Sequence, residues 1–132
     1  LGLAGAVRFT GPVPEDELVG LLQRAAVVAV PSLYEGFSLP AVEAMACAAP
    51  LVTTDAGALP EVVGGDAGLR VRAGDVDGLA AALRQVLDDP GRGERLGRAG
   101  RQRVLDRYTW RTTAERTAAW YGEVLGRAGR PC

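Results

Sequence analysis

Residues 25–61 read AAVVAVPSLYEGFSLPAVEAMACAAPLVTTDAGALPE, and this stretch decides the fold of the chain. The valine-rich run 25–31 predicts a strand that is buried on both faces, as in a parallel sheet covered by helices. Gly36 and Pro40 cannot continue that strand. A helix is expected to begin at Pro40 or one residue earlier, because proline is tolerated in the first turn of a helix. A second apolar run, 51–54, predicts the next strand. The chain is therefore expected to fold as an α/β domain with a parallel sheet flanked by helices.

Two glutamates frame the loop and helix that follow the first strand. Glu35 stands just past the carboxyl end of a parallel strand, where open α/β sheets bind ligands, and a loop carboxylate there accepts hydrogen bonds from polyols. The next residues lead into a helix N-terminus, which attracts a phosphate or diphosphate through the backbone N–H groups of Gly36, Phe37, Ser38 and Leu39. Glu43, about one turn into the helix, is placed to bind two vicinal hydroxyls, as acidic residues bind a ribose in dinucleotide folds. A sugar, a diphosphate and a ribose in a row make a nucleotide sugar.

The full sequence of this loop and helix resembles that of a known family. Residues 35–40 and 41–47 match the glutamate, seven residues, glutamate motif in the carboxyl-terminal domain of retaining glycosyltransferases with the GT-B fold, family 4 (group 1). Residues 57–61, 68–71 and 108–110 follow in the order that the family has. The resemblance spans nearly the whole chain. It implies an incomplete GT-B carboxyl-terminal domain with a Rossmann-like parallel sheet.

The resemblance also implies roles for single residues and for the whole chain. Glu35 orients the donor sugar as the catalytic residue, and Glu43 fixes the ribose. The expected reaction is the transfer of a glycosyl group from a nucleotide-diphosphate sugar to an acceptor with retention, by a hexosyltransferase whose donor-binding half is this chain. Residues 1–107 are then the nucleotide-sugar-binding domain without its N-terminal strands, and residues 108–132 are a helix that packs at the domain junction. The acceptor domain is expected on the amino-terminal side, and the isolated chain is expected to be inactive.

Other interpretations of the same residues stay open. The chain also fits a non-catalytic nucleotide-sugar-binding module, or a truncated product without activity. A loop glutamate such as Glu35 is often only solvated, and a glutamate near a helix start, such as Glu43, is favourable without any ligand. Glu61 opens a further predicted helix, so that it either faces the donor or only complements the helix dipole.

The residue types exclude several kinds of chemistry. The chain has no histidine, which excludes a histidine base, a serine-histidine triad and a histidine-ligated metal built from this chain alone. The oxygens of Glu35, Glu43 and Asp55 suit magnesium by type. The resemblance instead implies metal-independent chemistry without a cofactor, in which helix dipoles and basic side chains offset the charge of the diphosphate. The family's arginine and lysine pair for this purpose lies upstream, and Arg8 and Arg24 do not match it.

The charge and hydropathy of the chain limit its expected partners and its expected location. A net charge of -1 gives no general reason to expect nucleic acid as a partner. The two cysteines make no disulfide framework, and the apolar run 39–52 is interrupted by Glu43 and Pro50. We therefore expect a cytoplasmic protein, without a membrane span in this chain. The arginines between residues 92 and 107 favour either a solvated helix face or contact with an anionic membrane or lipid acceptor.

The amino-terminal and middle segments are expected to support this unit. Residues 7–9 predict a short strand, and the resemblance implies two earlier strands before it. Residues 14–25 predict an amphipathic helix. A final strand is expected over 68–71 and a helix over 79–87.

Two further helices are expected at the carboxyl end. The first carries Gly91, Gly93, Gly97 and Gly100, which we interpret as spacers in a mobile helical segment. A phosphate loop would need a strand before these glycines, and none is predicted there. Residues 109–125 predict a last amphipathic helix, whose aromatic side chains are either anchors for a partner or ordinary core residues.

Overall fold

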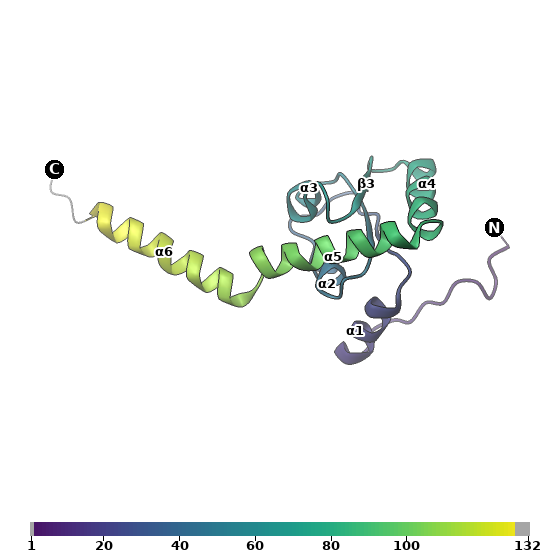
Figure 1. The fold of residues 1–132 in the computed structure, drawn as a ribbon, viewed down its shortest axis with the longest axis horizontal. Helices are drawn as coiled ribbons and strands as arrows, with labels where there is room; N and C mark the ends of the chain where they lie inside the picture. Colours follow the sequence, from purple (N-terminus) through teal and green to yellow (C-terminus); the bar gives the residue numbers. More distant parts are fainter. Residues whose placement is uncertain (1, 129–132) are drawn as a thin grey trace.

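The computed structural model describes residues 2–128, which form a parallel sheet flanked by helices (Figure 1). The predicted fold class is confirmed. The elements follow in the order α1 (Glu15–Arg24), β1 (Val28–Val30), α2 (Leu39–Ala46), β2 (Leu51–Thr54), α3 (Leu59–Val63), β3 (Leu69–Val71), α4 (Val76–Leu87), α5 (Pro90–Arg107) and α6 (Trp110–Ala128).

The sheet has the order β1-β2-β3, and both pairs of strands are parallel. Val30 lies opposite Thr53, and Thr54 lies opposite Val71. The central strand β2 is buried along its whole length. Because parallel strands end at the same edge of a sheet, the loops that follow the three strands lie together at that edge.

Alternating side chains of β2 enter two separate cores, because successive side chains of a strand point to opposite faces. On one face, Leu51 packs with Met45 of α2 and with Leu59 and Val63 of α3. On the other face lies a smaller cluster, which consists of Val52, Ala82, Val86 and Leu96. Helices α2 and α3 therefore cover one side of the sheet and α4 the other, while α5 contributes to both cores.

The glycines of α5 are packing positions. Gly93, Gly97 and Gly100 are buried, and they face Pro50, Ala48 and Met45 respectively. A Cβ added to Gly97 would stand 2.1 Å from the carbonyl oxygen of Ala48. The interpretation of these three glycines as mobile spacers was therefore wrong, because their spacing puts them on one helix face against α2 and the loop after it.

Residues 7–9 form no strand, and that prediction was also wrong. The segment is exposed, with Phe9 at 94%, and β1 has one neighbour among the strands of the described residues. No strand of the described residues lies beside residues 7–9, so within that part of the chain their backbone N–H and C=O groups have no ladder partner.

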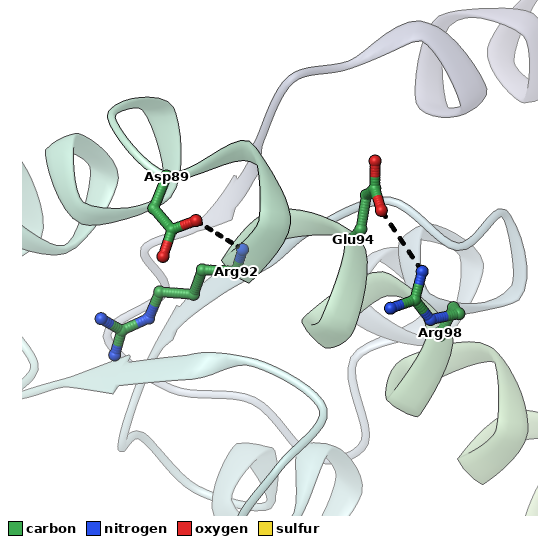
Figure 2. A network of polar contacts seen from close by, with 4 residues as sticks. All are labelled: Asp89, Arg92, Glu94 and Arg98. Atoms are coloured by element: carbon green, nitrogen blue, oxygen red, sulfur yellow. Dashed lines mark hydrogen bonds and ion pairs between the residues drawn. The ribbon is translucent and has the colours of Figure 1, made fainter.

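The arginines of α5 make mostly intramolecular contacts. Asp89 caps the helix by accepting a hydrogen bond from the backbone N–H of Arg92, and Arg98 pairs with Glu94 at 3.4 Å (Figure 2). Arg95 pairs with Asp89, and Arg101 donates to the carbonyl of Ala46. These contacts favour the interpretation of α5 as a solvated and structural helix face.

Arg103 joins α5 to the end of α3. Its guanidinium donates to the carbonyl oxygens of Val62 at 2.8 Å and Glu61 at 2.6 Å. Both carbonyls lie in the last turn of α3, where a cation complements the helix dipole. Arg103 therefore holds the helix that follows the β2 loop.

We expect Arg103→Ala to lower the melting temperature of the full-length protein by about 2–6 °C, because two hydrogen bonds to a charged donor are lost. Arg98→Ala in the same helix is the control. Its ion pair with Glu94 is exposed, and we expect the free energy of unfolding to fall by less than about 1 kcal/mol. Thermal unfolding of the two variants side by side checks this, and equal melting temperatures would contradict a structural role for Arg103.

Helix α6 extends away from the α/β body (Figure 1). Trp110 is 90% exposed, and Trp120, Tyr121 and Leu125 are exposed as well. The interpretation of the aromatic residues of this helix as ordinary core residues was therefore wrong. Residues 129–132 of the predicted junction segment lie outside the described residues. No helix among residues 2–128 is long and apolar enough to cross a membrane.

Candidate functional site

The loop after β1, the loop after β2 and the start of α2 meet at the carboxyl edge of the sheet. Glu35 lies in the first of these loops and is half-buried. Its carboxylate Oε1 accepts a hydrogen bond from the Ser32 hydroxyl at 2.8 Å. Its backbone carbonyl accepts a hydrogen bond from the N–H of Ala58 at 2.9 Å, which joins the loop to the turn after β2. Glu35 is therefore held at both its side chain and its backbone.

Gly57 makes the contact between these two loops possible. Its φ of +55° lies in the left-handed region, and a Cβ at this position would stand 2.1 Å from the carbonyl oxygen of Glu35. Only glycine therefore fits here without a shift of the Glu35 backbone. From the sequence, Gly57 was expected only to help turn the chain after the strand 51–54. Its position in a turn directly after a buried strand was the signal that pointed to it.

The N-terminus of α2 carries hydrogen-bond donors that have no acceptor among the described residues. Ser38 occupies the N-cap position with φ 74° and ψ 78°, and its side chain does not cap the helix. The Ser38 hydroxyl is buried without a partner among the described residues. Within the same described part of the chain, no hydrogen-bond acceptor is found for the backbone N–H groups of Gly36, Phe37, Ser38 and Leu39.

This combination is typical of a strained functional loop. A left-handed serine costs about 1–2 kcal/mol, and such conformations cluster at binding sites. Unpaired N–H groups at a helix start, together with the helix dipole, favour an anion. The start of α2 can therefore hold a phosphate group beside Glu35.

The other predicted site residues lie on the same loop and helix. Gly36 is exposed, and Phe37 packs edge-on against Tyr108 with ring centroids 5.5 Å apart. Leu39 is the first residue of α2, and Glu43 is exposed further along the same helix. The structure thus brings Glu35, the loop amides and Glu43 onto one loop-helix unit.

Glu61 lies apart from this unit. It is exposed in α3, and its backbone carbonyl is bound by Arg103. Asp55, the third oxygen ligand considered for magnesium, accepts a hydrogen bond from the N–H of Ala73 at 2.9 Å. Asp55 therefore ties the turn after β2 to the turn after β3. Within residues 2–128, no group of three or more acidic or cysteine side chains is arranged to hold a metal ion.

A hollow of about 440 Å³ lies between α2 and α6, next to the candidate site. Its lining includes Phe37, Leu39, Tyr108 and Trp110, and neither Glu35 nor Glu43 belongs to it. Arg107, Thr113 and Arg116 line it as well, and Trp110 is almost fully exposed on it. The hollow therefore offers apolar surface together with two guanidinium groups.

Comparison with known proteins assigns the chain to a family. The family described as glycosyl transferases group 1 matches residues 1–103. The chain is a member of this family. The MMP alpha-(1->4)-mannosyltransferase of Mycolicibacterium hassiacum is 46% identical to this group 1 chain over 129 residues, and the glycogen synthase of Mycobacterium tuberculosis is 47% identical over 117 residues. These similarities cover 96% and 88% of the chain.

The fold of the group 1 chain is shared with solved structures. The sucrose-phosphate synthase of Thermosynechococcus elongatus superposes with a TM-score of 0.85 and 34% identity over 95% of the chain. The resemblance to a GT-B carboxyl-terminal domain is confirmed. The chain spans 31% and 28% of the two curated relatives and 32% of this solved chain.

Proposed function

We propose that this chain is the donor-binding part of a family 4 retaining glycosyltransferase, which moves a hexosyl group from a nucleotide-diphosphate sugar to an acceptor. The start of α2 is the observation that carries the proposal. Its N–H groups are free to bind a diphosphate, and Glu35 stands beside them with its carboxylate already oriented. An anion site and a polyol site are thus adjacent on one loop.

The chemistry follows from charge development. As the bond between the anomeric carbon and the leaving phosphate breaks, negative charge grows on the diphosphate and positive charge on the sugar ring. Donors at the start of α2 stabilise the growing negative charge, because they are fixed before the reaction begins. Glu35 accepts hydrogen bonds from sugar hydroxyls and holds the ring near its reactive geometry. We assign Glu35 an orienting role and no covalent bond to the sugar.

Glu43 is proposed to bind the ribose. We expect Glu43→Gln to raise the Kd of the nucleoside diphosphate about tenfold, because hydrogen bonds to a charged acceptor become neutral ones. At saturating donor, kcat should change by less than about threefold, since ribose binding is the same in the ground and transition states. Calorimetric titration and initial rates on the full-length protein check both numbers. A lower kcat at unchanged Kd would contradict the assignment.

The reaction is tested on the full-length protein with a panel of nucleotide-diphosphate sugars. We expect release of nucleoside diphosphate with one donor and transfer with retained anomeric configuration, which NMR of the product reports. Binding without transfer would favour a non-catalytic module. The mass of the native polypeptide discriminates further, because two domains of usual size need roughly 300 residues or more.

The remaining roles concern partners and location. We propose that residues 1–107 form the donor-binding domain, and that 108–132 pack at the junction with an acceptor domain on the amino-terminal side. The exposed Trp110 and the hollow beside it support this, because they offer apolar surface next to the site. Donor contact by Glu61 stays a hypothesis. A cytoplasmic location is proposed, and so is metal-independent chemistry.

Contact with an anionic membrane or a lipid acceptor is the weaker hypothesis. Among the α5 arginines, the side chains of Arg92 and Arg107 take part in none of the contacts described above. Each basic residue near an anionic surface adds only about 1 kcal/mol. Two such residues therefore attract the protein only weakly to an anionic surface.

A further inference from the structure

We propose that Thr54 and Ser32 are positioning residues that orient the Glu35 carboxylate through a chain of two hydrogen bonds. The Thr54 hydroxyl donates to the carbonyl oxygen of Ser32 at 2.6 Å, and the Ser32 hydroxyl donates to Oε1 of Glu35 at 2.8 Å. The role rests on the function proposed above, in which Glu35 orients the donor sugar.

This chain of two hydrogen bonds, the relay, begins in the buried central strand. Thr54 is the last residue of β2, it is only 3% exposed, and it lies opposite Val71 in the sheet. A hydroxyl fixed at that point has little freedom, and its hydrogen bond is only weakly screened by water. Thr54 therefore transmits the position of the central strand to the loop that carries Glu35.

The second hydrogen bond sets the carboxylate itself. Ser32 and Glu35 are both half-buried, so that water competes only partly for their contact. A carboxylate has two oxygens with room for about four hydrogen bonds. The bond to Oε1 restricts the rotation of the carboxylate and leaves the other oxygen to a ligand.

The backbone of the loop is anchored independently of the relay. Ala58 donates to the Glu35 carbonyl, and Gly57 lets the two loops approach. Loss of one hydroxyl should therefore free the carboxylate without releasing the loop. Removing either hydroxyl should therefore lower kcat and change the Kd of the nucleoside diphosphate only slightly.

The test uses the full-length protein and four variants. Ser32→Ala and Thr54→Val remove one donor each, and we expect each to lower kcat about tenfold at a nearly unchanged Kd for the nucleoside diphosphate. Thr54→Ser keeps the hydroxyl and should retain most of kcat. Thr53→Val is the matched control. Thr53 is the buried neighbour in β2, and its hydroxyl has no partner among the described residues, so kcat should stay at the wild-type value.

A double-mutant cycle with Glu35→Ala decides whether the relay acts through Glu35. If it does, Ser32→Ala should cost little more in the Glu35→Ala background, because the carboxylate that Ser32 positions is absent there. A tenfold loss in both backgrounds would overturn the proposal. So would wild-type kcat in Ser32→Ala, or an equal loss in Thr54→Ser and Thr54→Val. If Thr54→Val does not fold, Ser32→Ala and the double-mutant cycle still test the proposal.

These outcomes separate the relay from the function on which it rests. If Glu35→Gln lowers kcat and Ser32→Ala does not, the relay is refuted and the role of Glu35 stands. If Glu35→Gln itself has wild-type kcat, the proposed role of Glu35 is refuted, and the relay with it.

Discussion

Replacing Glu35 by glutamine in the full-length protein is expected to lower kcat by about 100-fold, or about 2.7 kcal/mol of transition-state stabilisation. The amide has the same shape, and its oxygen can still accept from the Ser32 hydroxyl. It lacks the negative charge, however, so that hydrogen bonds from the sugar become weaker and the sugar less precisely held. The Kd of the nucleoside diphosphate should change by less than about fivefold, because the diphosphate is bound at the start of α2.

Steady-state rates and calorimetric titration of the same samples check this expectation. Glu15→Gln is a suitable control, since Glu15 is an exposed glutamate in the first turn of α1, away from the loops after the strands. Turnover of Glu35→Gln at the wild-type rate would remove Glu35 from the mechanism. A large loss of nucleotide affinity would instead assign Glu35 to the nucleotide.

Gly97→Ala is expected to destabilise the packing of α5 strongly. The new Cβ would stand 2.1 Å from the Ala48 carbonyl oxygen, a contact with backbone that no side-chain rotation relieves. Helices α2 and α5 must then move apart, which costs about 1–3 kcal/mol or more in a packed core. We expect a melting temperature lower by about 5–10 °C in the full-length protein.

Gly91→Ala is the control for this prediction, because Gly91 lies in the first turn of the same helix. A Cβ there would meet only the side chains of Asp89 and Arg95, at 3.3 and 3.5 Å. We expect its melting temperature to stay close to the wild-type value, since alanine is the better helix former. Equal melting temperatures for the two variants would show that α2 and α5 separate at no cost.

The sequence predicted those elements whose pattern is local. The strand over 51–54 was predicted with its observed bounds, because an apolar run between Pro50 and the turn at Gly57 leaves little room for error. Pro40 likewise marked the start of α2 within one residue. The loop that carries Glu35 was found for the same reason.

Features that depend on distant partners were not predictable in this way. Residues 7–9 have the composition of a strand, but pairing needs a neighbour that the pattern cannot supply. In the sequence, Gly97 looks like a spacer. Its packing role comes from the Ala48 backbone, which lies against it only in the folded structure. The hydrogen bond from Thr54 to Ser32 joins residues 22 positions apart, and no local pattern encodes it.

A crystal structure of the full-length protein with a bound nucleoside diphosphate tests the donor-binding proposal most directly. We predict diphosphate oxygens within about 3.2 Å of the backbone N–H groups of residues 36–39, with the ribose hydroxyls on Glu43. A diphosphate bound elsewhere, for example against the arginines of α5, would contradict the proposed site.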